Sequence, residues 1–202
     1  MNSTLNLKVF ILISLFAAMT AIGAFIAIPI PFSPVPVVLQ NFFIIFMGLV
    51  LPPSMSAASV GLYLFLGAVG FPIFAGGTGG IAHFISPSAG YLVAYFPAAV
   101  IGSIITKIHY EGKVNHNITE KSAVKINKTL LIDLLSVTVM IIVIYIGGIL
   151  WLKYRLNITW AKSILVGVTP FIPGCIVKCT AAIILAPKIR NFLKQEGFLV
   201  SN

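Results

Sequence analysis

The chain is dominated by long apolar runs that almost lack charged residues. The first of them, from Val9 to Ile28, contains no Asp, Glu, Lys or Arg. Over the whole sequence 59% of residues are hydrophobic, 8% are charged, and the mean hydropathy is +1.08. A soluble domain needs a far more polar surface, so the bilayer must be the solvent of this chain. Because a membrane-spanning helix takes roughly 20 residues, we expect a single all-α membrane domain over residues 1–202, with about six spans.

Six apolar segments are the expected spans. They are Lys8–Ile28, Val38–Leu51, Met55–Gly70, Gly90–Ile108, Leu130–Leu152 and Gly174–Ile189. The second and sixth are short for a full crossing, so we expect them to tilt or to end within the membrane against protein. Prolines such as Pro52 and Pro53 mark the joints, because proline removes a backbone donor and clashes with the preceding turn.

The basic residues are distributed unevenly between the two sides of this arrangement. Three of them, Lys153, Arg155 and Lys162, fall on one side, and nine fall on the side of the termini: Lys8, Lys107, Lys113, Lys121, Lys125, Lys128, Lys188, Arg190 and Lys194. Short loops rich in Lys and Arg face the cytoplasm. Both termini are therefore expected in the cytoplasm, and the net charge of +9 reflects membrane orientation, not nucleic-acid binding.

The opposite, outer side carries three unusual segments: Pro29–Val37, Phe71–Ala89 and Lys153–Pro173. They are rich in Pro and Gly and nearly free of acidic residues. Irregular backbone at membrane depth is tolerated where it folds into protein or lines a cavity. A ligand site is therefore expected at the outer face.

Lys178 is the strongest single candidate for ligand binding. It lies inside the sixth apolar segment, where an ionisable group costs roughly 2.5–3.5 kcal/mol to insert at mid-membrane. Snorkelling to the interface is the structural alternative. Asp133, the acid nearest to a span, is expected at the opposite, cytoplasmic end, so the sequence offers Lys178 no carboxylate partner. A ligand carboxylate would suit it.

Weaker candidates have equally good structural explanations. Gln40 and Asn41 open the second span, where they could cap the helix or contact a ligand, and the same holds for Tyr91, His83, Ser86 and Ser88. The turn Gly76-Gly-Thr-Gly-Gly80 lets the backbone approach a ligand, although a tight loop explains it as well.

Two further patterns concern small residues. Ala17 and Ala21 form a small-xxx-small stripe on the first span, which could face a partner helix or an internal neighbour. Cys175 and Cys179, the two cysteines of the sequence, are expected to be small buried residues and neither a disulfide nor a metal pair.

Several function classes lack the residues they need. The sequence contains no G-x-x-x-x-G-K-[ST] phosphate loop and no nucleophile and base on adjacent spans. It also shows no second intramembrane charge for proton coupling and no inverted repeat. We therefore expect neither an enzyme nor a metal protein. A binding subunit driven by a separate ATPase is favoured over a stand-alone secondary transporter.

Five ordered motifs resemble the BioY family over nearly the whole chain. They are Pro34-Val-Pro-Val-Val-Leu-Gln40, Leu62-Tyr-Leu-Phe-Leu-Gly-Ala-Val-Gly-Phe-Pro-Ile-Phe74, Gly76-Gly-Thr-Gly-Gly80, Pro87-Ser-Ala-Gly-Tyr91 and Pro170-Phe-Ile-Pro-Gly-Cys-Ile-Val-Lys178. The resemblance implies a biotin-binding S component of an energy-coupling factor (ECF) vitamin transporter in a prokaryotic plasma membrane. It also implies a transmembrane coupling protein, contacted through Ala17 and Ala21, and two ATPase subunits that hydrolyse ATP. Lys178 corresponds to the lysine of the family, and we expect Gln40, Tyr91, Gly79 and Ser86 to contact the substrate as well.

Three positions depart from the pattern of the biotin binders. Thr78 replaces an Asn in the glycine turn, Leu92 replaces an Arg after Gly-Tyr, and Cys175 replaces the acid of Pro-Gly-Asp-x-x-Lys. Asp and Asn suit the ureido ring of biotin, and a buried ureido group left unpaired costs about 1–3 kcal/mol. Biotin and lipoate, a carboxylate without a polar ring, therefore both remain candidate substrates.

Overall fold

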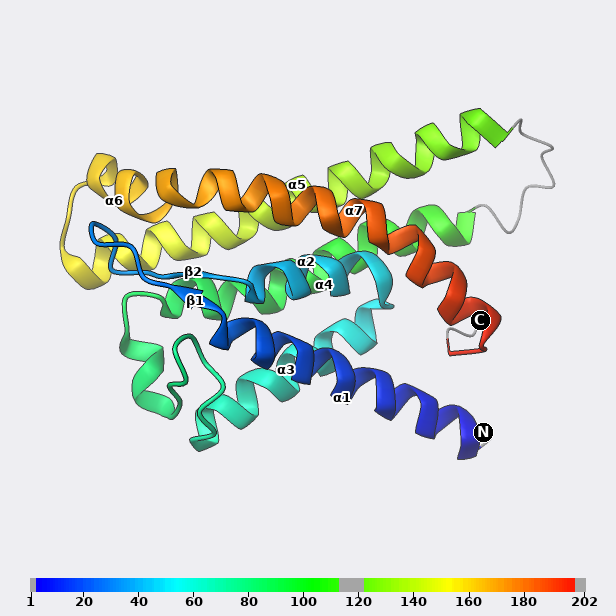
Figure 1. Ribbon diagram of the computed structural model, residues 1–202, viewed down its shortest axis with the longest axis horizontal. Coiled ribbons are helices and arrows are strands. Elements are labelled where there is room, and N and C mark those ends of the chain that lie inside the picture. Colours follow the sequence, from blue (N-terminus) through cyan, green and yellow to red (C-terminus); the bar gives the residue numbers. More distant parts are fainter. Residues whose placement is uncertain (1–2, 113–121, 199–202) are drawn as a thin grey trace.

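The computed structural model describes residues 3–112 and 122–198 and is helical almost throughout (Figure 1). The main helices are α1 (Ser3–Phe25), α2 (Gln40–Val50), α3 (Pro53–Val69), α4 (Ala89–Gly112), α5 (Ser122–Leu156) and α7 (Ile172–Gln195). The shorter elements are β1 (Ala27–Ile28), β2 (Val37–Val38), η1 (Ile81–Ile85), α6 (Trp160–Gly167) and η2 (Thr169–Phe171). The predicted all-α fold with six principal helices is confirmed.

The outward-facing surface of these helices is apolar, as expected of a surface that contacts lipid. Leu7–Phe25, Ala89–Ile108, Lys128–Leu156 and Trp160–Gln195 are long and apolar enough to cross a membrane, whereas α2 and α3 are apolar but shorter. Large apolar side chains point outward from the long helices: on α1, Phe10 is 67% exposed, and on α5, Leu131 is 65% exposed. In water such a surface would be strongly unfavourable, but in a bilayer it faces hydrocarbon. The chain is a multi-pass membrane protein.

The expected bounds of the first and last spans are wrong. The first helix ends at Phe25, because Ala27 and Ile28 pair antiparallel with Val38 and Val37. The last span is not short: α7 has 24 residues and continues through Pro187 to Gln195. Its final turns therefore carry Arg190 inside the helical bundle.

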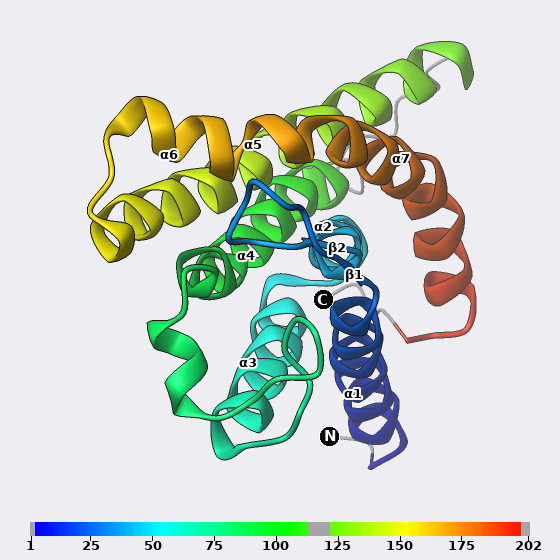
Figure 2. The ribbon, with the colours of Figure 1, turned by 60° about the vertical axis from the view of Figure 1, so that its left-hand side comes forward.

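Helix α2 lies at the centre of the bundle. It packs against α1, α3, α4, α5 and α7, and Figure 2 looks nearly along its axis. Every residue from Ile44 to Val50 is buried, as expected of a helix that is apolar all round. Its 11 residues span about 16 Å, roughly half of the ~30 Å hydrocarbon core. The prediction that this span is short is confirmed.

A buried ion pair closes the carboxyl end of α2. Asp133 is fully buried and Arg190 is 5% exposed. The guanidinium donates from Nη1 to Oδ1 over 2.9 Å and from Nη2 to Oδ2 over 2.5 Å, and Nη1 also donates to the Leu49 carbonyl over 3.0 Å. That carbonyl would normally accept from the residue four positions later, but Pro53 has no N–H. The ion pair thus joins α5 and α7 to the end of α2.

This pairing corrects the sequence-based view of two charges. We expected Arg190 in the cytoplasmic tail and no carboxylate among the spans, and the structure instead pairs Arg190 with Asp133 inside the bundle. Asp133 is therefore a carboxylate among the spans, but Arg190 occupies both of its oxygens. Lys113 and Lys121 lie outside the described residues.

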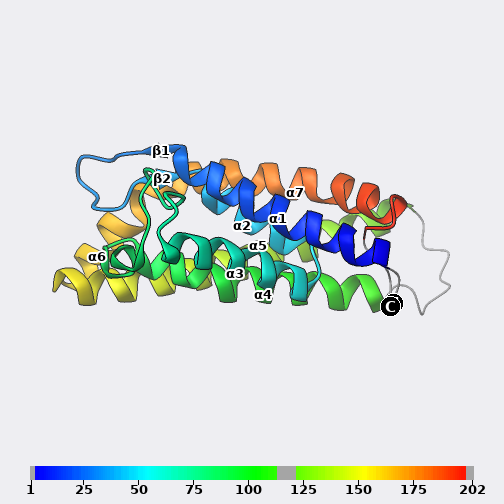
Figure 3. The same ribbon diagram turned by 90° about the horizontal axis from the view of Figure 1, so that it is seen from below.

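The two ends of the molecule differ in character. The amino end of α1 and the carboxyl end of α7 lie at the same end (Figures 1 and 3), where Lys8 Nζ donates to the Glu196 carbonyl over 2.7 Å. The β1–β2 hairpin, η1 and α6 gather at the opposite end. There Ser33 Oγ donates to the Val166 carbonyl over 2.8 Å and joins the hairpin loop to α6.

Removing one member of the buried pair should strongly destabilise the fold. Arg190→Met leaves the Asp133 carboxylate buried without its partner and should lower the free energy of unfolding by about 3–5 kcal/mol. The double variant Asp133→Leu with Arg190→Met should recover part of that loss. Thermal unfolding of the detergent-purified protein measures both, with exposed Lys188→Met as the control. An Arg190→Met protein as stable as the control would contradict this assignment.

Candidate functional site

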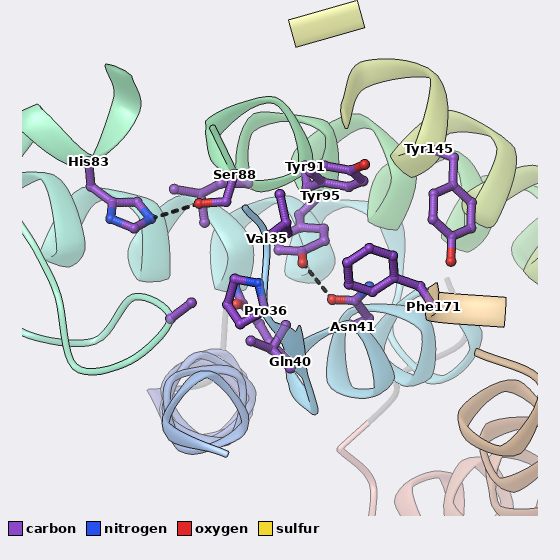
Figure 4. Close-up of a pocket in the computed structure, with 13 residues that line it drawn as sticks. Val35, Pro36, Gln40, Asn41, His83, Ser88, Tyr91, Tyr95, Tyr145 and Phe171 are labelled. Carbon is purple, nitrogen blue, oxygen red and sulfur yellow. Dashed lines mark hydrogen bonds between the residues drawn. The ribbon is translucent and has the colours of Figure 1, made fainter. Parts of the chain in front are cut away.

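A cavity opens among the irregular segments at the hairpin end of the bundle. It contains about 500 Å³ of empty space, counting the part open to solvent at its mouth. It is lined by Val35, Pro36, Val38, Gln40, Asn41, Ala75, His83, Ser88, Tyr91, Leu92, Tyr95, Tyr145 and Phe171. Most of the lining residues come from the β1–β2 hairpin and from α2, η1, α4, α5 and η2. Figure 4 shows how most of these side chains converge.

The first turn of α2 supplies the amide groups of the cavity. The Gln40 amide donates from Nε2 to the Tyr63 hydroxyl over 2.8 Å, and that hydroxyl donates to the Ile73 carbonyl over 3.2 Å. Asn41 Oδ1 accepts from the Tyr95 hydroxyl over 2.5 Å (Figure 4). The Asn41 amide nitrogen makes no hydrogen bond within the described part of the chain, so two N–H donors remain at the cavity.

Aromatic side chains form one wall. Tyr91 meets Tyr145 edge to face, with ring centroids 6.4 Å apart, and its ring lies 6.5 Å from that of Phe171. The Tyr91 hydroxyl donates to the Gly167 carbonyl over 2.7 Å, so it fixes α4 to the end of α6. Leu92 lines the same cavity. This wall offers ring faces and apolar surface to a ligand.

The η1 side of the cavity is polar. His83 Nδ1 pairs with the Thr78 hydroxyl at 2.9 Å, and its Nε2 pairs with the Ser88 hydroxyl at 3.4 Å. Burial lowers the pKa of His83 below its usual 6.5, so the ring is neutral at pH 7. Thr78 does not line the cavity; it lies behind His83 and also donates to the Ala75 carbonyl over 3.0 Å.

Ser86 and Gly79 have structural roles in this region. The Ser86 hydroxyl pairs with Ser88 at 3.0 Å, and the Ser86 carbonyl accepts from Trp151 Nε1 over 2.8 Å. Neither Ser86 nor Gly79 lines the cavity. A Cβ at Gly79 would collide with the Phe71 carbonyl, so the glycine is required by this turn.

Lys178 and Cys175 flank the cavity from the first turns of α7. Lys178 Nζ donates to the Val38 carbonyl over 2.9 Å, at the strand that contributes Val38 to the lining. Cys175 is half-buried and lies beside Tyr145, another lining residue. Neither side chain is itself part of the lining, so both are residues of the cavity edge.

The predicted site residues therefore separate into two groups. Gln40, Tyr91 and Leu92 line the cavity, whereas Lys178, Cys175, Thr78, Ser86 and Gly79 lie at or behind its edge. Tyr95, Tyr145 and Phe171 also line the cavity, and the sequence patterns did not predict them. Tyr95 follows Tyr91 by four residues, a spacing that places both on one helical face, so that signal was present in the sequence.

The small-residue stripe of α1 is not where we expected it. Ala17 is 5% exposed and belongs to the core, and Ala21 is half-buried. The exposed face of α1 instead carries Ser14 and Ala18, which are also four residues apart. Ala17 therefore packs against helices of its own chain.

Comparisons with known proteins agree with this fold. A sequence profile of the BioY family matches residues 1–195. The chain belongs to the BioY family. A probable biotin transporter BioY from Pyrococcus horikoshii is 36% identical over 180 residues, covering 89% of this chain and 94% of that protein. The biotin transporter BioY of Lactococcus lactis is 34% identical over 178 residues, covering 88% of this chain and 85% of that protein.

A solved structure matches this BioY-family chain over most of its length. It is the crystal structure of the S component for biotin from an ECF-type ABC transporter, with a TM-score of 0.78 and 30% identity, covering 95% of each chain. BioY proteins are transporter S components and not enzymes, which confirms the prediction that this chain is no enzyme.

Proposed function

We propose that this protein captures biotin at the outer face of a prokaryotic plasma membrane, as the S component of an ECF-type transporter. The observation that carries the proposal is the cavity at the hairpin end, with amide donors inside it and Lys178 at its edge. The BioY family and the 30%-identical biotin S component support the ligand class. A stand-alone secondary transporter remains the alternative of another class.

Lys178 is the proposed anchor for the carboxylate of the ligand. An ammonium group has three N–H donors, and the described hydrogen bonds assign one of them to the Val38 carbonyl. The other two can meet a carboxylate, and charge-assisted hydrogen bonds of this kind are stronger than neutral ones. Because Val38 lines the cavity, a ligand held there places its acid end within reach of the lysine.

The polar groups of the cavity can replace the missing Asp and Asn. The Asn41 amide is available to donate to a ureido carbonyl, and the Ser88 hydroxyl can accept from a ureido N–H. The aromatic wall formed by Tyr91, Tyr145 and Phe171 suits the apolar part of the ligand. The Asn41 donor and the Ser88 acceptor favour biotin over a ligand without a polar ring.

Lipoate remains the second candidate because of Cys175. The thiol lies beside Tyr145, at the position where the BioY pattern carries an acid. A thiol is a poor acceptor for a ureido N–H, but it is compatible with an apolar dithiolane ring. Both ligands share the carboxylate that Lys178 would bind.

The chain needs partners that supply energy. The sequence contains no phosphate loop, so ATP hydrolysis is assigned to two ATPase subunits that act through a transmembrane coupling protein. The exposed α1 face with Ser14 and Ala18 is the proposed contact for that protein, since small residues allow close helix packing in membranes.

The charge distribution supports cytoplasmic termini. With Arg190 paired to Asp133 inside the bundle, eight lysines remain on the side of the termini, against Lys153, Arg155 and Lys162 on the hairpin side. The side of the termini still carries the excess of basic residues, so we assign the cavity to the outer face.

Lys178→Ala should weaken biotin binding by at least about tenfold, because a hydrogen bond to a charged group contributes about 1.5–3 kcal/mol. Equilibrium binding to the detergent-purified protein measures this. Exposed Lys162→Ala is the matched control and should bind as the unaltered protein does. Unchanged affinity in Lys178→Ala would remove the lysine from the site.

The substrate question has its own test. Biotin and lipoate are compared side by side on the unaltered protein and on the variant Cys175→Asp. The unaltered protein should bind biotin, and the variant should raise the ratio of biotin to lipoate affinity by adding an acceptor for a ureido N–H. Lipoate binding without biotin binding by the unaltered protein would overturn biotin as the substrate.

A further inference from the structure

The two cysteines of the chain form a thiol pair beside the cavity. Cys175 and Cys179 are four residues apart on one face of α7, and their sulfur atoms are 3.7 Å apart. Cys175 is half-buried and Cys179 is buried. The sequence contains no other cysteine, so any thiol chemistry of the chain belongs to this pair.

The two sulfur atoms are close enough for a single atom to bridge them. A soft centre bonded to two thiolates at about 2.3 Å, with the roughly 100° angle of a pyramidal trivalent atom, separates the sulfurs by about 3.5 Å. The observed separation of 3.7 Å, a contact between two reduced thiols, differs from this value by only a small side-chain rotation.

Two sulfur ligands are too few for a usual protein metal site but sufficient for a monosubstituted arsenic atom. Metal sites in proteins usually have four ligands, and within the described residues no group of three or more His, Cys, Asp and Glu is assembled. A trivalent arsenic atom that carries one organic group needs only two sulfurs. We propose that Cys175 and Cys179 form a dithiol site for monosubstituted trivalent arsenicals at the edge of the cavity.

The bonding change is balanced without any oxidant or reductant. An arsenic oxide R–As=O reacts with both thiols: the two S–H bonds break, two S–As bonds form, and the oxygen leaves with both protons as water.

The organic group of the arsenical would interfere with ligand binding. Cys175 lies beside Tyr145, which lines the cavity, so a substituent on the bridging arsenic has to share space with that wall. This consequence rests on the proposed function, whereas formation of the dithiol adduct does not.

The adduct is tested with phenylarsine oxide on the purified full-length protein, by intact-mass spectrometry. The unaltered protein should gain one phenylarsenic group per chain, and a dithiol reductant should remove it while a tenfold excess of a monothiol does not. Cys175→Ser and Cys179→Ser should each lose the stable adduct. Retention of the adduct by either single variant, or its absence from the unaltered protein, would overturn the dithiol site.

A second readout separates this site from the proposed function. Phenylarsine oxide should reduce biotin binding at least tenfold in the unaltered protein but leave it unchanged in Cys179→Ser, which keeps Cys175 and Lys178. A protein that forms the adduct but never binds biotin contradicts the proposed function and leaves the dithiol site standing. Equal loss of biotin binding in both proteins would show that the arsenical acts elsewhere.

Discussion

The fold depends on placing a half-length helix at the centre of a membrane bundle. Helix α2 is largely buried and too short to cross the hydrocarbon core, so its carboxyl end is buried among other helices. In such surroundings every backbone group needs a partner. At the carboxyl end Pro53 cannot supply the N–H that Leu49 requires, and Arg190 supplies it while paired with Asp133. A charged pair is therefore retained inside an otherwise apolar bundle.

The short length of α2 also makes room for the site at its amino end. Because the helix begins below the hairpin, its first turn places Gln40 and Asn41 under the irregular outer segments. Gln40 is held by Tyr63, and Asn41 is held by Tyr95. The amide groups are thus positioned by the helices around them, and the first turns of α7 bring Lys178 and Cys175 to the edge of the cavity. One short helix links the buried ion pair to the ligand cavity.

Sequence patterns predicted the six principal helices and the irregular segments between them, because hydropathy and proline act locally. Of the predicted site residues, Gln40, Tyr91 and Leu92 line the cavity. The Asp133–Arg190 pair was missed because the residues are far apart in sequence and Arg190 follows Pro187, which does not end the helix. Ala17 was assigned to the wrong face because composition does not determine how α1 is rotated against its neighbours. Tyr145 and Phe171 come together with Tyr91 only through packing of α4, α5 and η2.

The proposed function places the ligand in the cavity above α2, with its carboxylate at Lys178. A structure of the biotin-bound protein would test this placement. We expect the ring system among Asn41, Tyr91 and Phe171, and the carboxylate within about 3 Å of Lys178 Nζ. Biotin bound away from the first turn of α2, or with its carboxylate remote from Lys178, would show that the cavity or the lysine is wrongly assigned.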